Sequence, residues 1–73
     1  MINDLAVYLE TGRKAAIARR EHDESRAAFF ADWALRAIRL EAPEDQPAAR
    51  AAYRTGYRGG SYRHGVILEG GAL

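Results

Sequence analysis

Arginine and tyrosine side chains recur at helical spacing near the C-terminal end of this 73-residue chain. Arg50, Arg54 and Arg58 stand four residues apart, so a helix places them on one face, with Tyr53 and Tyr57 between them. No acidic residue occurs from position 46 to position 68. Because guanidinium groups bind carboxylates and phosphates in a bidentate manner and stack on aromatic rings, this Arg/Tyr stripe predicts a binding surface rather than a reaction centre. We assign partner binding to six side chains: Arg50, Arg54, Tyr57, Arg58, Tyr62 and Arg63.

The Arg/Tyr stripe also has a purely structural interpretation. In that case the arginines form a solvated helix face, and Tyr53 and Tyr57 belong to the hydrophobic core. The sequence leaves both interpretations open.

Side chains suited to catalysis are scarce. The chain has no cysteine, and neither of its serines, Ser25 and Ser61, lies in the sequence context of a nucleophilic serine. His22 has no second metal ligand three or four residues away, and His64 has no evident acid to orient it as a base. We therefore predict a protein that is not an enzyme and that needs no cofactor and no metal.

Length and composition predict one small domain that associates. A chain of this size buries only about 60% of its unfolded surface, and without cysteine it has no disulfide to compensate. We therefore expect a homodimer. Ten of the eleven basic residues are arginine, which fits either a GC-rich genome or a functional choice of guanidinium groups. Residues 1–45 carry nine acidic and seven basic side chains, and residues 46–73 carry one and four, so the positive charge gathers at the C-terminal end.

The location of the protein is predicted from what the sequence lacks. No apolar run reaches the ~20 residues of a membrane span, and the N-terminus has no signal-peptide pattern. We expect a cytoplasmic protein without membrane partners.

Hydrophobic periodicity predicts an all-α fold with helices over residues 4–20, 24–41 and 46–58, where Asn3 or Asp4 caps the first helix. The polar residues 19–26 separate the first two helices. They form either the turn of a helical hairpin, capped by Asp23 or Ser25, or an exposed part of one long helix over residues 13–41. We favour the hairpin. Gly12, on the apolar face, permits close approach of another helix or else interrupts the first one.

The third helix is delimited by proline and glycine. Pro43 ends the second helix, Asp45 is expected to cap the third, and Pro47 fits its first turn. Gly59 and the glycine after it end the helix. These limits divide the chain into a helical domain, residues 1–60, and a glycine-rich C-terminal tail, residues 61–73. Within the tail, residues 66–68 either form a short strand or become ordered on a partner.

The predicted core combines the apolar faces of the three helices. Its members are Leu5, Leu9, Ile17, Phe30, Trp33, Ala37, Ile38 and Tyr53. We expect Trp33→Ala to be the most destabilising single substitution, by about 3–5 kcal/mol if the ring is fully buried.

Two segments rich in alanine, arginine and aromatic residues, at positions 26–33 and 49–58, resemble the small helical accessory proteins of temperate phages, including quorum-sensing anti-activators. The resemblance implies a regulator that inhibits a host protein, such as a transcription regulator or a defence complex, by direct contact. Residues 52–60 also resemble a stretch of ribosome modulation factors, which are more basic and carry it near the N-terminus. A protein-binding regulator is thus our first hypothesis, and a small nucleic-acid-binding protein that uses the Arg/Tyr stripe is the alternative.

Overall fold

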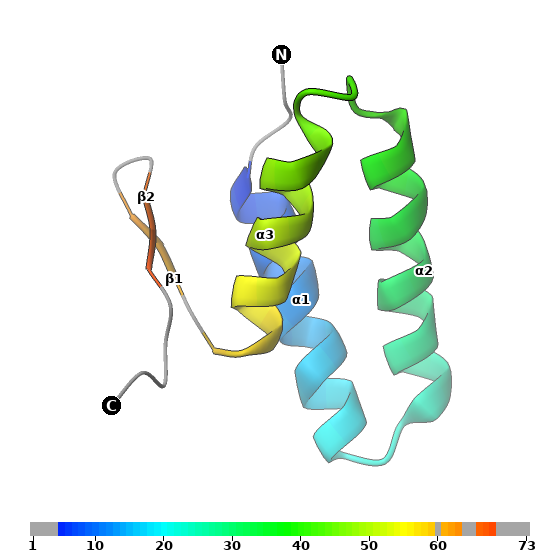
Figure 1. The fold of residues 1–73 in the computed structure, drawn as a ribbon. Coiled ribbons are helices and arrows are strands. Elements are labelled where there is room, and N and C mark those ends of the chain that lie inside the picture. The colour runs from blue at the N-terminus through cyan, green and yellow to red at the C-terminus, as the bar shows by residue number, and fades with distance from the viewer. Residues whose placement is uncertain (1–4, 60, 64–65, 69–73) are drawn as a thin grey trace.

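The computed structural model describes residues 5–59, 61–63 and 66–68, and it consists of three helices followed by a short hairpin (Figure 1). The helices are α1 (Leu5–Arg20), α2 (Glu24–Leu40) and α3 (Gln46–Tyr57). Strands β1 (Ser61–Arg63) and β2 (Val66–Leu68) pair in antiparallel fashion, with Tyr62 opposite Ile67. The small all-α domain predicted from the sequence is confirmed, and α2 and α3 each end one residue earlier than predicted. The proposed caps Asn3 and Asp4 lie outside the described residues.

A tight turn at residues 21–23 separates α1 from α2, so the hairpin interpretation is confirmed and the single long helix is wrong. His22 adopts a positive φ of 60°, and the Asp23 N–H donates to the carbonyl oxygen of Ala18 at 2.9 Å. The Asp23 carboxylate then accepts a hydrogen bond from the Arg26 N–H at 3.1 Å, which caps α2. The capping aspartate and the left-handed residue before it therefore reverse the chain.

The connection between α2 and α3 is compact. Glu41 takes extended backbone angles after α2, and its carbonyl oxygen accepts a hydrogen bond from the Gln46 side chain at 3.2 Å. Pro47 lies in the first turn of α3, as predicted. Asp45 precedes α3, but its side chain makes no capping hydrogen bond, so that part of the prediction is wrong. Its backbone already has helical angles (φ −95°, ψ −16°), unlike a typical N-cap residue.

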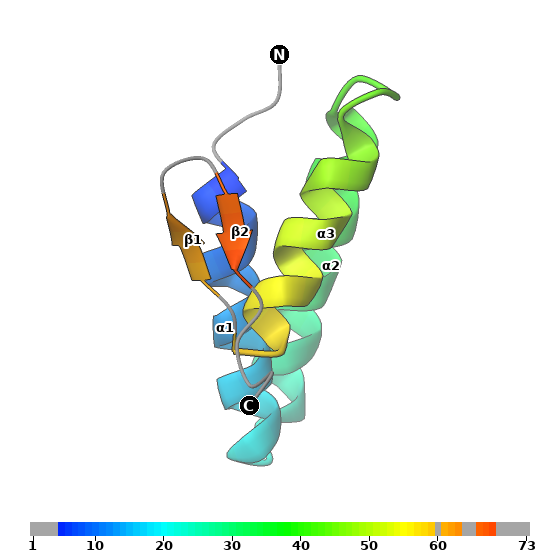
Figure 2. The same ribbon diagram turned by 60° about the vertical axis from the view of Figure 1, so that its left-hand side comes forward.

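Helices α1 and α3 run in the same direction and pack at backbone distance through two glycines (Figures 1 and 2). A Cβ atom on Gly12 would overlap the carbonyl oxygen of Tyr53, and one on Gly56 would overlap the carbonyl oxygen of Leu9. Gly12 therefore permits close helix approach, and the alternative of a break in the first helix is wrong. Helix α1 also packs along α2, whereas α2 and α3 touch each other little.

The core is small and built mainly from alanine. Tyr8 is the largest fully buried side chain, and Leu9 and Ile38 are the other large buried apolar residues among those described. The remaining buried apolar side chains are Ala15, Ala18, Ala27, Ala34, Ala49 and Ala52.

Two residues predicted for the core lie largely outside it. Ile17 is 45% exposed and Trp33 is 40% exposed. Both occupy the edge of an apolar helix face, and no third helix covers that edge.

The helices are stacked two deep: α3 lies in front of α1, and α2 lies to one side of this pair (Figure 1). The Cα atoms span 35 × 30 × 13 Å. The chain exposes 5239 Å². A compact monomer of 8.1 kDa is expected to expose about 4500 Å². The exposed surface is therefore about 700 Å² larger than that of a compact monomer of the same mass.

Candidate functional site: the α2/α3 groove and the end pocket

A groove runs between α2 and α3 because these two helices do not pack closely on each other. It has a volume of about 400 Å³. We call it the α2/α3 groove. Its walls are formed by Ala31, Ala34, Leu35 and Ile38 of α2 and by Arg50, Tyr53, Arg54 and Tyr57 of α3. Four of the five residues of the Arg/Tyr stripe thus line one side of an apolar groove.

The α3 wall combines aromatic surface with positive charge. The Tyr53 and Tyr57 rings lie side by side, with centroids 6.4 Å apart and planes 34° apart. Burial, and then the neighbouring Tyr57, raise the pKa of Tyr53, so its hydroxyl remains a neutral hydrogen-bonding group near neutral pH. Arg50 and Arg54 are exposed and form no ion pair among the described residues. Both guanidinium groups are therefore available to a carboxylate or phosphate.

The Arg/Tyr stripe does not stay on a single surface. Residues four apart on a helix differ by about 40° in direction, so a row of three turns gradually away from its starting face. Arg50 and Arg54 line the groove, whereas Arg58 lies beyond the end of α3 and lines a second hollow. Tyr57 lines both hollows and connects them. The side chains of Tyr62 and Arg63, also predicted for the site, lie outside the part of the chain that the structure describes.

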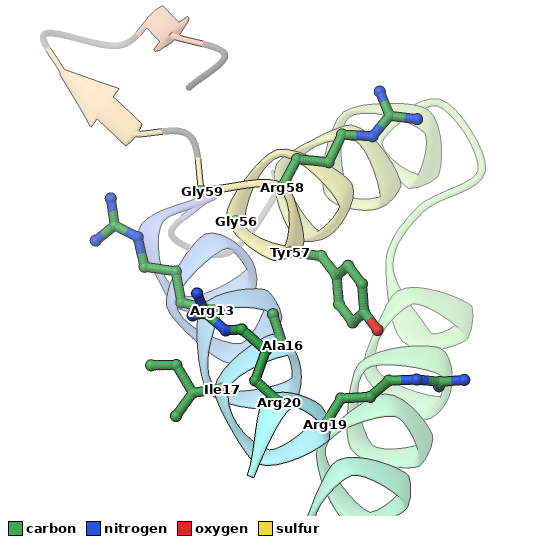
Figure 3. Close-up of a pocket in the computed structure, with 9 residues that line it drawn as sticks. All are labelled: Arg13, Ala16, Ile17, Arg19, Arg20, Gly56, Tyr57, Arg58 and Gly59. Atoms are coloured by element: carbon green, nitrogen blue, oxygen red, sulfur yellow. The ribbon is translucent and has the colours of Figure 1, made fainter. Parts of the chain in front are cut away.

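The second hollow, the end pocket, lies just beyond the end of α3, beside the last two turns of α1 (Figure 3). It has a volume of about 560 Å³. Its lining consists of Arg13, Ala16, Ile17, Arg19, Arg20, Gly56, Tyr57, Arg58 and Gly59, with no acidic residue. Figure 3 shows the Tyr57 ring projecting from α3 with its hydroxyl on the Arg19 side, while the Arg58 side chain points away from α1. The arginines therefore surround an open cationic hollow and do not converge on one point.

The charges of the end pocket are only partly balanced. Arg13 pairs with Glu10 at 3.7 Å, while Arg19, Arg20 and Arg58 have no carboxylate partner among the described residues. Arg19 and Arg20 lie in the last turn of α1, where positive charge offsets the negative end of the helix dipole. These α1 arginines were not predicted from the sequence as part of a site. The available signal was a basic last turn, but only the parallel packing of α1 and α3 brings it beside Arg58.

A third surface lies on α2 on the side away from the groove. Phe29 is 65% exposed and Leu40 is 87% exposed, and with Trp33 and Ala37 they border a hollow of about 240 Å³. We call this surface the outer face of α2. Asp32 and Arg36 lie at its edge and form an ion pair at 3.0 Å, one helical turn apart.

The described part of the chain contains no group of three or more histidine, cysteine, aspartate or glutamate side chains that could hold a metal ion. None of its helices has the length and apolar character needed to cross a membrane.

Comparison with known proteins found no matching protein-family model, no similar curated protein and no similar solved structure.

Proposed function

We propose that this protein is a small, non-enzymatic regulator that binds a segment of another protein in the α2/α3 groove. One observation carries the proposal: a single groove combines apolar and aromatic walls with two exposed arginines that have no carboxylate partner among the described residues. Tyrosine and arginine are the residue types enriched at the energetic centres of protein interfaces. Such a groove suits an amphipathic segment that carries acidic residues along one side.

The dimensions of the groove support a helical segment. Helix α3 has 12 residues, so the wall that it supplies is about 18 Å long, or roughly three helical turns. An amphipathic helix of that length places its apolar face between Leu35 and Tyr53. Acidic residues on its flank then meet Arg50 and Arg54, which bind carboxylates in a bidentate manner.

The resemblance to phage accessory proteins supports a finer form of the proposal. The partner is a host protein, such as a transcription regulator or a defence complex, and binding inhibits it. The protein acts in the cytoplasm, as a homodimer.

Affinity capture from a nuclease-treated bacterial lysate names the partner, and titration of the purified partner tests the groove. We expect Arg50→Gln/Arg54→Gln to weaken binding by at least about tenfold, since two charge-assisted contacts are lost. Arg19→Gln/Arg20→Gln removes the same charge from the end pocket and serves as the matched control, with an expected change below about twofold. Equal effects of the two variants would contradict the groove as the binding site.

The end pocket favours a second candidate function, binding of single-stranded nucleic acid. Three arginines without a carboxylate partner in the described part of the chain surround a half-exposed tyrosine ring, and together they offer phosphate contacts and a stacking surface. In that case nucleic acid copurifies with the protein and is released above roughly 0.3 M salt. The same two variants distinguish the candidates, because Arg19→Gln/Arg20→Gln would then cause the larger loss.

A further inference from the structure

We propose that the outer face of α2 pairs with the same face of a second copy of this chain, with the two α2 helices antiparallel. This surface gathers three large exposed apolar side chains on one helix face: Phe29, Trp33 and Leu40 are 65%, 40% and 87% exposed. Residues two apart on a helix point about 160° from each other, so Trp33 and the groove residue Leu35 lie on nearly opposite sides of α2. Pairing through this face therefore leaves the groove open.

The shape of the outer face is complementary to itself. In an antiparallel pair with a two-fold axis near position 35, Trp33 of each copy lies opposite Ala37 of the other. A large side chain thus meets a small one at the centre. The hollow of about 240 Å³ bordered by Phe29, Trp33, Ala37 and Leu40 supplies room for the opposing side chains. Symmetry produces each of these contacts twice.

The charges at the edge of the outer face are also complementary to themselves. Asp32 and Arg36 lie on the same flank of α2, one turn apart and 3.0 Å from each other. The two-fold axis brings this flank against its copy, so Asp32 of one chain approaches Arg36 of the other. Because the flank carries one charge of each sign, a strongly acidic or basic partner gains little there, whereas a second copy matches both charges.

The exposed area of the chain agrees with one interface of ordinary size. The chain exposes about 700 Å² more than a compact monomer of its mass, and each partner in a standard interface buries about 800 Å². One dimer contact therefore brings the exposed surface back to the range of compact proteins.

Sedimentation velocity and light scattering on the full-length protein test the proposal. We expect a mass twice the 8.1 kDa of the chain in the micromolar range. Phe29→Gln/Leu40→Gln should give a monomer with an unchanged helical circular dichroism spectrum, because both residues are mainly exposed. Leu35→Gln, the control, exchanges a 51% exposed leucine on the groove side of the same helix and should remain dimeric. A monomeric wild type, or a dimer that survives the double substitution and dissociates in Leu35→Gln, would overturn the proposal.

A charge exchange tests the antiparallel arrangement and does not depend on the apolar substitutions. Asp32→Arg places an arginine opposite Arg36 of the other copy, twice in the symmetric dimer, and should weaken the dimer by at least about tenfold. Asp32→Arg/Arg36→Asp restores opposite charges and should recover dimerisation; failure to recover would exclude the antiparallel register. Arg50→Gln/Arg54→Gln leaves the dimer intact, so failure of the partner-binding proposal and failure of this one give different results.

Discussion

Tyr8 and Glu41 form a buried polar contact that joins the beginning of α1 to the residue after α2. The Tyr8 hydroxyl donates to the Glu41 carboxylate at 2.5 Å, and Glu41 is only 8% exposed. A carboxylate removed from water is costly unless it receives hydrogen bonds. The hydroxyl of Tyr8 therefore contributes more to the free energy of unfolding than a hydrogen bond at an exposed site would.

Tyr8→Phe keeps the ring and removes this donor. We expect the free energy of unfolding to fall by about 1–3 kcal/mol, because the Glu41 carboxylate loses its buried partner. Urea unfolding measures the change. Tyr57→Phe, which alters a half-exposed ring, is the control and should cost less than about 0.5 kcal/mol. If Tyr8→Phe and Tyr57→Phe lower the free energy of unfolding by similarly small amounts, the Glu41 carboxylate is hydrated.

Trp33 has a smaller part in the core than its size suggested. Its ring lies 6.0 Å from the Tyr8 ring, yet 40% of the residue is exposed. We now expect Trp33→Ala to cost about 1–2 kcal/mol and Tyr8→Ala about 3–5 kcal/mol. The two substitutions should be compared in a protein that also carries Phe29→Gln/Leu40→Gln, because dimerisation then does not add to the measured free energy of unfolding. A larger loss for Trp33→Ala than for Tyr8→Ala would reverse the order that we derive from burial.

At the scale of elements, the α1–α3 contact depends on two glycines facing each other's backbone. Helix propensity alone predicts that Gly12→Ala stabilises α1 by about 1 kcal/mol. We expect Gly12→Ala to destabilise the protein instead, because the new methyl group would overlap the backbone of α3 at Tyr53. Denaturant unfolding of Gly12→Ala and Gly56→Ala should show losses above about 2 kcal/mol. Ala48→Gly, on the exposed side of α3, is the control that measures the effect of helix propensity alone. A gain in stability for Gly12→Ala would show that α1 and α3 can move apart at little cost in free energy.

The limits of the helices could be predicted because local chemistry sets them. Asp23 caps α2 through its own side chain, and Gly59, with a φ of 88°, follows the end of α3. Asp45 was predicted as a cap on the same grounds, but its helical backbone angles keep its side chain from that role. Local signals thus locate helix ends more reliably than they assign the hydrogen bonds at those ends.

The outward-facing surfaces could not be predicted, since they depend on which helices touch. The apolar face of α2 is wider than the contact with α1, and nothing in the periodicity tells which edge remains exposed. Trp33 was therefore placed in the core. The end pocket was missed for a similar reason, because Arg19 and Arg58 become neighbours only through the parallel packing of α1 and α3. The groove was predicted in part, because Arg50 and Arg54 share a face of a single helix.

At the scale of the whole molecule, α1 is the helix that packs closely on both others, and α2 therefore keeps two accessible faces. The groove and the outer face lie on nearly opposite sides of α2. A dimer joined through the outer face would therefore carry two grooves. Two linked grooves bind a paired target more tightly than either groove alone, provided that the spacing of the target segments matches.

The alanine-rich core also determines how the protein responds to temperature. Heat capacity rises on unfolding mainly because apolar surface becomes hydrated, and a core built mainly from alanine has little dry apolar surface to expose. We expect a heat-capacity change below the ~0.9–1.1 kcal/mol/K that is usual for 73 residues, and hence a shallow stability curve with a broad calorimetric transition. Phe29→Gln/Leu40→Gln should lower the heat-capacity change further and remove the dependence of the midpoint on protein concentration. Scanning calorimetry at two concentrations measures both quantities, and a heat-capacity change at or above the usual range would mean that folding buries more apolar surface than this core provides.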